Sequence, residues 1–119
     1  MRPLLLALAL LAAMPAPGAG EETAAIDIVR NPSAYRDRYL TVRGTMMNLR
    51  PATAGGVASP TGTIFDLVTG AAFLVVHSPV PLACPIGSTV TVDGRFVPMV
   101  QIRQQLYTNV IEATLVACR

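Results

Sequence analysis

Lysine and tryptophan are absent from this chain of 119 residues, and only 13% of its residues are charged. Every basic residue except one histidine is an arginine, and the formal net charge at pH 7 is +2. A protein that attracts a polyanion usually carries a strongly basic patch, which this composition does not supply. Three Phe and three Tyr also fall short of the aromatic rows on which single-stranded nucleic acids stack.

Histidine is nearly absent as well, because His77 is the only one. It has no partner at a metal-ligand spacing, and we interpret it as a polar strand-end residue, the alternative being a ligand or a catalyst. The sequence contains no Ser/His/Asp spacing and no phosphate-binding loop, and Asp66, Asp93 and Glu112 are isolated. We therefore predict a protein that is not an enzyme and that has no cofactor and no metal.

Only one long apolar run is present, from Leu4 to Met14, and it is shorter than the roughly 18 to 20 residues that span a membrane. Arg2 precedes this run, and small residues and prolines follow it up to Gly20. These features predict a signal peptide over residues 1–20, cleaved after Ala19 or Gly20 during export to the periplasm or the exterior. An uncleaved N-terminal anchor is the alternative. The remaining residues, 21–119, suffice for one domain with one core.

Both cysteines, Cys84 and Cys118, belong to the predicted mature chain. An exported protein matures where disulfide bonds persist, so a structural disulfide is the favoured interpretation. Free thiols and a catalytic thiol are the alternatives, although no base that would activate a thiol is recognisable.

Alternation of apolar and polar residues predicts a mostly β domain that follows a short helix. Gly44 and Gly94 interrupt two of its strands at positions suited to a bend or bulge. Loops are predicted over 48–61 and 98–105, and an irregular, proline-rich connection over 78–87. The predicted elements are a helix within Glu21–Arg30, a polar turn over Ser33–Arg38, a strand over Tyr39–Met46, a hairpin of Gly62–Val68 and Ala71–His77, and strands over Ser88–Val97 and Leu106–Ala117.

Four parts of the sequence together resemble a known fold: Asp27–Tyr35 leading into Leu40–Gly44, the Phe65-Asp-Leu strand, Gly87–Gly94, and Ile111–Leu115. The chain resembles the OB-fold, and in particular the tRNA-anti-like domains and the bacterial OB-fold stress proteins of the periplasm. The resemblance implies an all-β, five-stranded OB-fold-like Greek-key barrel with a short N-terminal helix, preceded by a signal-peptide helix. It also implies that the last two strands form a hairpin that brings Cys118 close to Cys84, as a disulfide requires.

OB-folds bind ligands mainly on the outer face of strands two and three, between two flanking loops. On this basis the candidate ligand-binding residues are Arg50, Arg95, Arg103, Tyr107 and Gln105. An alternative interpretation leaves the arginines as solvated surface and places Phe65, Phe73 and Phe96 in the core.

The function expected from this resemblance is that of an exported, non-catalytic binding module of the cell envelope. Its partner would be a small anionic or carbohydrate-like ligand or an envelope protein. A single-stranded nucleic-acid-binding protein and a structural or assembly protein are the alternatives.

Overall fold

The computed structural model describes residues 20–54, 57–79, 81–82, 84–102 and 104–118. The predicted signal-peptide helix and Arg103 lie outside this part of the chain. No helix within it is long and apolar enough to cross a membrane. The elements are β1 (Glu21–Glu22), α2 (Ala25–Arg30), a 3₁₀-helix (Pro32–Tyr35), β2 (Tyr39–Ala54), β3 (Val57–Thr69), β4 (Ala72–Ser78), β5 (Thr89–Ile102) and β6 (Gln105–Cys118).

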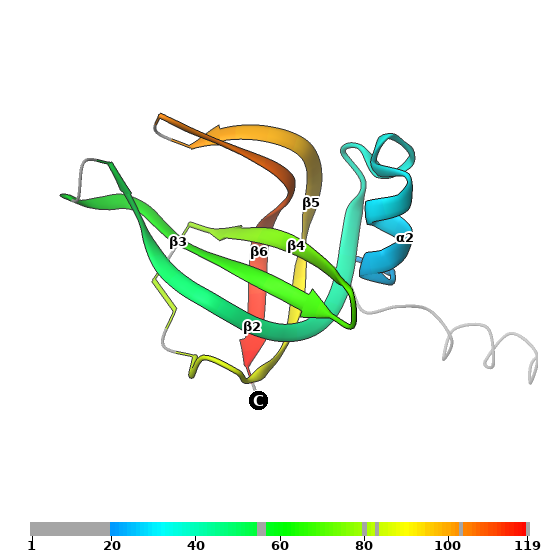
Figure 1. The fold of residues 1–119 in the computed structure, drawn as a ribbon, viewed down its shortest axis with the longest axis horizontal. Helices are drawn as coiled ribbons and strands as arrows, with labels where there is room; N and C mark the ends of the chain where they lie inside the picture. Colours follow the sequence, from blue (N-terminus) through cyan, green and yellow to red (C-terminus); the bar gives the residue numbers. More distant parts are fainter. Residues whose placement is uncertain (1–19, 55–56, 80, 83, 103, 119) are drawn as a thin grey trace, which may run out of the picture.

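Strands β2 to β6 close into a barrel, which confirms the predicted all-β, OB-fold-like class (Figure 1). Antiparallel hairpins join β2 to β3, β3 to β4, and β5 to β6. Two ladders between distant parts of the chain complete the barrel. Strand β2 pairs antiparallel with β5 over Tyr39–Thr45, whereas β4 pairs parallel with β6 only over Val75–His77.

Alternate side chains of the strands fill the barrel, as the pleat of a β-strand requires. Phe65, Leu74 and Phe96 are completely buried there, so the core placement of Phe65 and Phe96 is confirmed. Phe73 instead points outward, and 55% of it is exposed. The reason is the tight turn between β3 and β4, which pairs Phe73 with Val68 and fixes both on the outer face.

Two glycines lie where strands bend or approach each other closely. At Gly44, where β2 passes from β5 to β3, a Cβ atom would come 2.8 Å from the carbonyl oxygen of Val68. Gly94 lies at a bulge of β5, where a Cβ atom would come 2.4 Å from the carbonyl oxygen of Glu112. The bulge predicted at Gly94 is confirmed, whereas Gly44 lies where β2 and β3 approach each other closely.

The N-terminal helix is shorter than the predicted span of Glu21–Arg30. Glu21 and Glu22 form strand β1, which pairs parallel with β2, and α2 begins only at Ala25. The extended backbone places the glutamates beside arginines of the barrel, with Glu22 Oε1 3.4 Å from Arg43 Nε. The end of the helix at Arg30 agrees with the prediction. The 3₁₀-helix begins at Pro32, one residue before the predicted polar turn, and overlaps that turn up to Tyr35.

Two hairpins extend beyond the barrel wall as arms, so the loops predicted over 48–61 and 98–105 are wrong (Figure 1). Strands β2 and β3 continue to Ala54 and from Val57, and strands β5 and β6 to Ile102 and from Gln105. The proline at position 51 is compatible with this pairing because, among the described strands, the arm portion of β2 pairs with β3 alone. We call residues 97–102 and 104–110 the β5–β6 arm.

A disulfide between Cys84 and Cys118 joins the irregular β4–β5 connection to the C-terminal strand, as the resemblance implied. Cys118 pairs with Val90 in the β5–β6 ladder, which brings the end of β6 to the start of β5. The two Cα atoms are 5.9 Å apart, within the usual range for a disulfide. Cys84 is buried against the barrel core, so the bond attaches an irregular segment whose cysteine is itself part of the core to the end of β6.

Candidate functional site

The outer face of β3 and β4 is the surface expected to bind ligands, and the β5–β6 arm covers part of it. Ile64 and Val75 point outward from the barrel and yet are buried. They form a second hydrophobic cluster with Ile102 and Val110, against which Tyr107 packs. The chain itself therefore occupies one part of the expected ligand face.

A hollow of about 340 Å³ lies beside this cluster, between β4 and β6 and next to α2. Its lining combines aromatic, aliphatic and uncharged polar side chains, and none of its residues is an acid, an arginine or a histidine. We call it the β4–β6 fork. Its lining includes Phe73 and Val75 of β4 and Leu106, Tyr107, Thr108 and Asn109 of β6.

The fork exists because β4 and β6 separate where their parallel ladder ends. The ladder pairs Val75 with Val110 and does not continue toward Phe73 and Thr108. Asn109 has a φ of 55°, a left-handed conformation that asparagine adopts more readily than most residues. Asn109 directly precedes Val110, the residue at which the ladder with β4 begins.

Arg50 lies on β2 and points toward the outer face of β3. Its Nη2 atom is 3.7 Å from Asp66 Oδ1, and its Nη1 atom donates a hydrogen bond of 2.5 Å to the carbonyl oxygen of Asn48. The side chain of Asn48 in turn donates to Asp66 Oδ2 over 2.7 Å. The Arg50 guanidinium is thus paired with a carboxylate and is not a free cation awaiting an anion.

The other candidate residues do not gather around Arg50. Arg95 Nη1 contacts Asp37 Oδ1 at 3.2 Å, just after the 3₁₀-helix. Tyr107 lines the fork, and Gln105 is exposed at the start of β6, opposite Ile102. Arg103 lies outside the described residues.

The barrel brings His77 together with Glu112, a pair that the sequence reasoning missed. They are direct partners in the β4–β6 ladder, and His77 Nδ1 is 2.9 Å from Glu112 Oε2. The interpretation of Asp66, Asp93 and Glu112 as isolated carboxylates is therefore wrong. Glu112 contacts His77, Asp66 contacts Arg50 and Asn48, and Asp93 accepts a hydrogen bond from Thr41. Only the register of a parallel ladder between distant strands would have shown the His77–Glu112 pair. No group of three or more metal-ligating side chains occurs within the described ranges.

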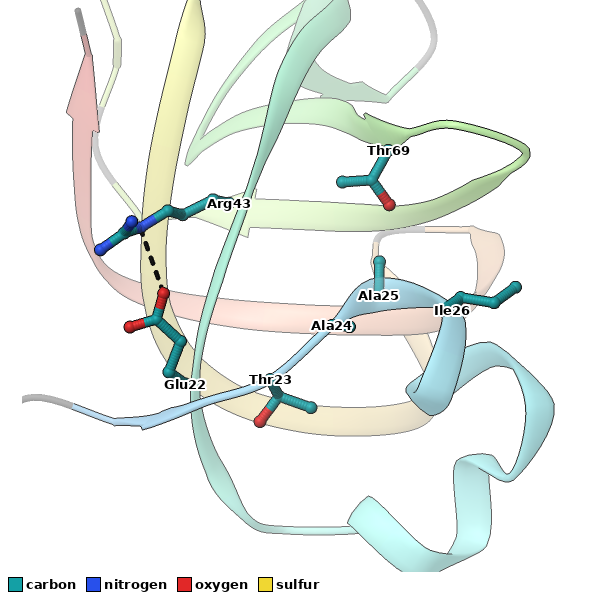
Figure 2. A pocket seen from close by; sticks show the side chains of 7 residues that line it. All are labelled: Glu22, Thr23, Ala24, Ala25, Ile26, Arg43 and Thr69. Atoms are coloured by element: carbon teal, nitrogen blue, oxygen red, sulfur yellow. Dashed lines mark ion pairs between the residues drawn. The ribbon is translucent and has the colours of Figure 1, made fainter.

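A second hollow, of about 360 Å³, lies where the N-terminal segment crosses β2 (Figure 2). Figure 2 shows Glu22 and Arg43 facing each other as an ion pair on one side, with Thr69 and the start of α2 on the other. Both charged side chains are largely exposed, so water screens their field. The fork is the better candidate because it combines aromatic side chains with the face on which OB-folds bind ligands.

Comparison with known proteins gives no matching family model and no matching curated protein. The chain is similar in structure to a chain assigned as an aspartyl-tRNA synthetase of Leishmania major Friedlin, with a TM-score of 0.59 and 11% sequence identity. The shared feature is the fold. The match covers 89% of this chain and 21% of the synthetase chain, so the present protein corresponds to about a fifth of that chain.

Proposed function

We propose that this protein is an exported, non-catalytic binding module of the cell envelope that holds its partner in the β4–β6 fork. The observation that carries the proposal is an uncharged hollow, lined by Phe73 and Tyr107, on the ligand-binding face of an OB-fold-like barrel. Pockets with mainly apolar walls and a few polar groups are typical binding sites.

The lining favours an uncharged partner over an anionic one. A carbohydrate-like molecule or a protein segment fits a wall of aromatic, hydroxyl and amide groups. An anion would need a free cation, whereas Arg50 and Arg95 each lie beside a carboxylate. A charged group placed in the fork would lose hydration without gaining an opposite charge.

Binding rather than catalysis is supported by the composition of the same wall. Tyr107 is the only residue of the lining with a titratable side chain, so the fork offers no acid and base in contact. Export is supported by the N-terminal sequence, and the Cys84–Cys118 bond suits an oxidising compartment.

The alternative is a single-stranded nucleic-acid-binding role, favoured by the exposed ring of Phe73 and by the shared fold with a synthetase chain. The low net charge and the pairing of Arg50 and Arg95 with carboxylates weigh against it. A structural or assembly role is the second alternative, because the described part of the chain leaves strand edges of the arms unpaired.

The proposal is tested on protein expressed with its natural N-terminal segment and isolated from the envelope of its host. Native mass spectrometry should detect a bound partner on the wild-type protein and on Leu115→Ser, and should detect none on Phe73→Ser. Leu115 is the matched control because 59% of it is exposed, close to the 55% of Phe73, and it does not line the fork. Equal occupancy of the two variants, or retention of the protein in the cytoplasm, would contradict the proposal.

A further inference from the structure

We infer that the partner in the β4–β6 fork is an extended, uncharged peptide segment, which adds a strand to the free edge of β6. This inference rests on the proposed function and narrows the class of partner. It follows from three properties that the fork shows within the described residues: unpaired backbone, an unprotected strand edge and an uncharged wall.

The first property is the backbone that faces the hollow. In each strand of an antiparallel hairpin, every second residue has N–H and C=O groups that point away from the partner strand. Counted from the tight turns that pair Ile102 with Gln105 and Thr69 with Ala72, these residues are Leu106 and Thr108 on β6 and Phe73 on β4. The β4–β6 ladder begins only at Val75. The fork therefore presents the hydrogen-bonding groups that an added strand uses.

The second property is the absence of the usual protection of a strand edge. Natural proteins shield exposed edges with charged side chains, prolines or a covering segment. From Leu106 to Asn109, β6 contains neither a charged residue nor a proline, and 58% of Leu106 is exposed. An exposed, uncharged edge without proline pairs readily with another extended chain.

The third property is that the wall of the fork is uncharged, which determines the side chains that a bound peptide can place against it. An added strand would direct alternate side chains against Phe73 and Val75 and the others toward solvent. Because the lining contains no acid or base that could pair with a charged side chain, the inward positions of the peptide should be uncharged. A hollow of about 340 Å³ is at the small end of ligand sites, which suits a short stretch of chain.

The test uses a short, capped, fluorescently labelled peptide of alternating valine and threonine, measured by fluorescence anisotropy. A second peptide of the same sequence carries N-methyl groups on alternate amides, so that it keeps the side chains and loses donors. The wild-type protein should bind the methylated peptide at least about tenfold more weakly than the parent peptide, because two or more hydrogen bonds are lost. Equal affinity for the two peptides would overturn strand addition.

The protein offers a matched pair of variants, because Met99 and Thr108 lie directly opposite each other in the arm. Thr108→Pro removes an N–H that faces the fork, and Met99→Pro removes one that faces the opposite, solvent side of the arm. Peptide affinity should fall at least about tenfold for Thr108→Pro and change less than about twofold for Met99→Pro. Equal losses in the two variants would contradict the inference.

Amide hydrogen exchange tests the inference on the wild-type protein, so its result does not depend on whether a variant folds. The parent peptide should protect the amides of Leu106 and Thr108, and the absence of protection would overturn the inference. Failure of the peptide to bind, with a Phe73-dependent partner still found in the envelope, would refute the peptide and leave the proposed function standing. A dimer abolished by Thr108→Pro would instead identify a second copy of this chain as the occupant and refute a separate peptide partner.

Discussion

Removal of the disulfide between Cys84 and Cys118 should cost a large share of the stability of this domain. The two residues are 34 positions apart, and the chain-entropy model gives about 4 kcal/mol for a cross-link that closes a loop of this length. Domains of this size have about 5 to 15 kcal/mol of total stability. The same loss corresponds to a decrease in Tm of about 15 to 30 °C, since about 1 kcal/mol shifts the Tm of a 60–100-residue domain by about 4 to 8 °C.

The measurement compares the oxidised protein, the protein reduced with a phosphine, and the Cys84→Ala/Cys118→Ala variant in urea unfolding followed by far-UV circular dichroism. The reduced wild-type protein is the necessary control, because Cys84 is buried and its replacement also removes packing contacts. Reduction alone should account for most of the loss. A loss below about 1 kcal/mol would refute the chain-entropy reasoning for this loop. Two free thiols on the unfolded, unreduced exported protein would refute the bond.

Three further predictions concern the barrel and its surface. Gly94→Ala should lower the free energy of unfolding by about 1 to 3 kcal/mol, because its Cβ atom would meet the carbonyl oxygen of Glu112; unchanged urea stability would contradict this. Phe96→Ala should cost about 3 to 5 kcal/mol in the same assay, whereas Phe73→Ala should cost less than about 1 kcal/mol, and similar losses would argue against the inside–outside assignment. A labelled single-stranded oligonucleotide should show no binding at low salt, and binding that falls steeply as salt rises would favour the nucleic-acid alternative.

The barrel wall was predictable because its signals are local. Alternation over Tyr39–Met46 predicts a strand, and the turn signal at Thr69-Gly70 predicts a hairpin, in each case without reference to distant residues. The turn itself lies one residue later, at Gly70-Ala71. Gly44 and Gly94 were recognisable for the same reason, since a glycine inside a strand indicates a bend or a close approach.

The arms were not predictable from local composition. The sequence over 48–61 is rich in proline and glycine, which predicts a loop when a strand is assumed to pair on both sides. A strand of a two-stranded arm tolerates proline more readily, because it forms hydrogen bonds with one neighbour and its other edge does not need a backbone N–H donor. The pairing of residues 45–51 with 63–68 is thus decided by the hairpin as a whole.

The candidate site was predictable only in outline. The resemblance to the OB-fold directed attention to the outer face of β3 and β4, beside which the fork lies, and Tyr107 does line the hollow. The choice of arginines overlooked their carboxylate partners, which come from other strands and from the segment after the 3₁₀-helix. The outward position of Phe73 and the conformation of Asn109 depend on turns and register that residue type alone does not reveal.

The ladder between β2 and β5 has a consequence for the speed of folding. It pairs Tyr39 with Arg95 and Thr45 with Thr89, so its formation must close a loop that contains β3, β4 and the irregular connection. Contacts between such distant residues slow folding, because the entropy of loop closure is lost before the contacts are gained. The β3–β4 and β5–β6 hairpins need only local contacts, and we expect them to form before the barrel closes. We therefore expect the meeting of β2 and β5 to limit the rate of folding. The disulfide should do little to accelerate this step, because it joins Cys84 to Cys118 and does not shorten the loop between Thr45 and Thr89.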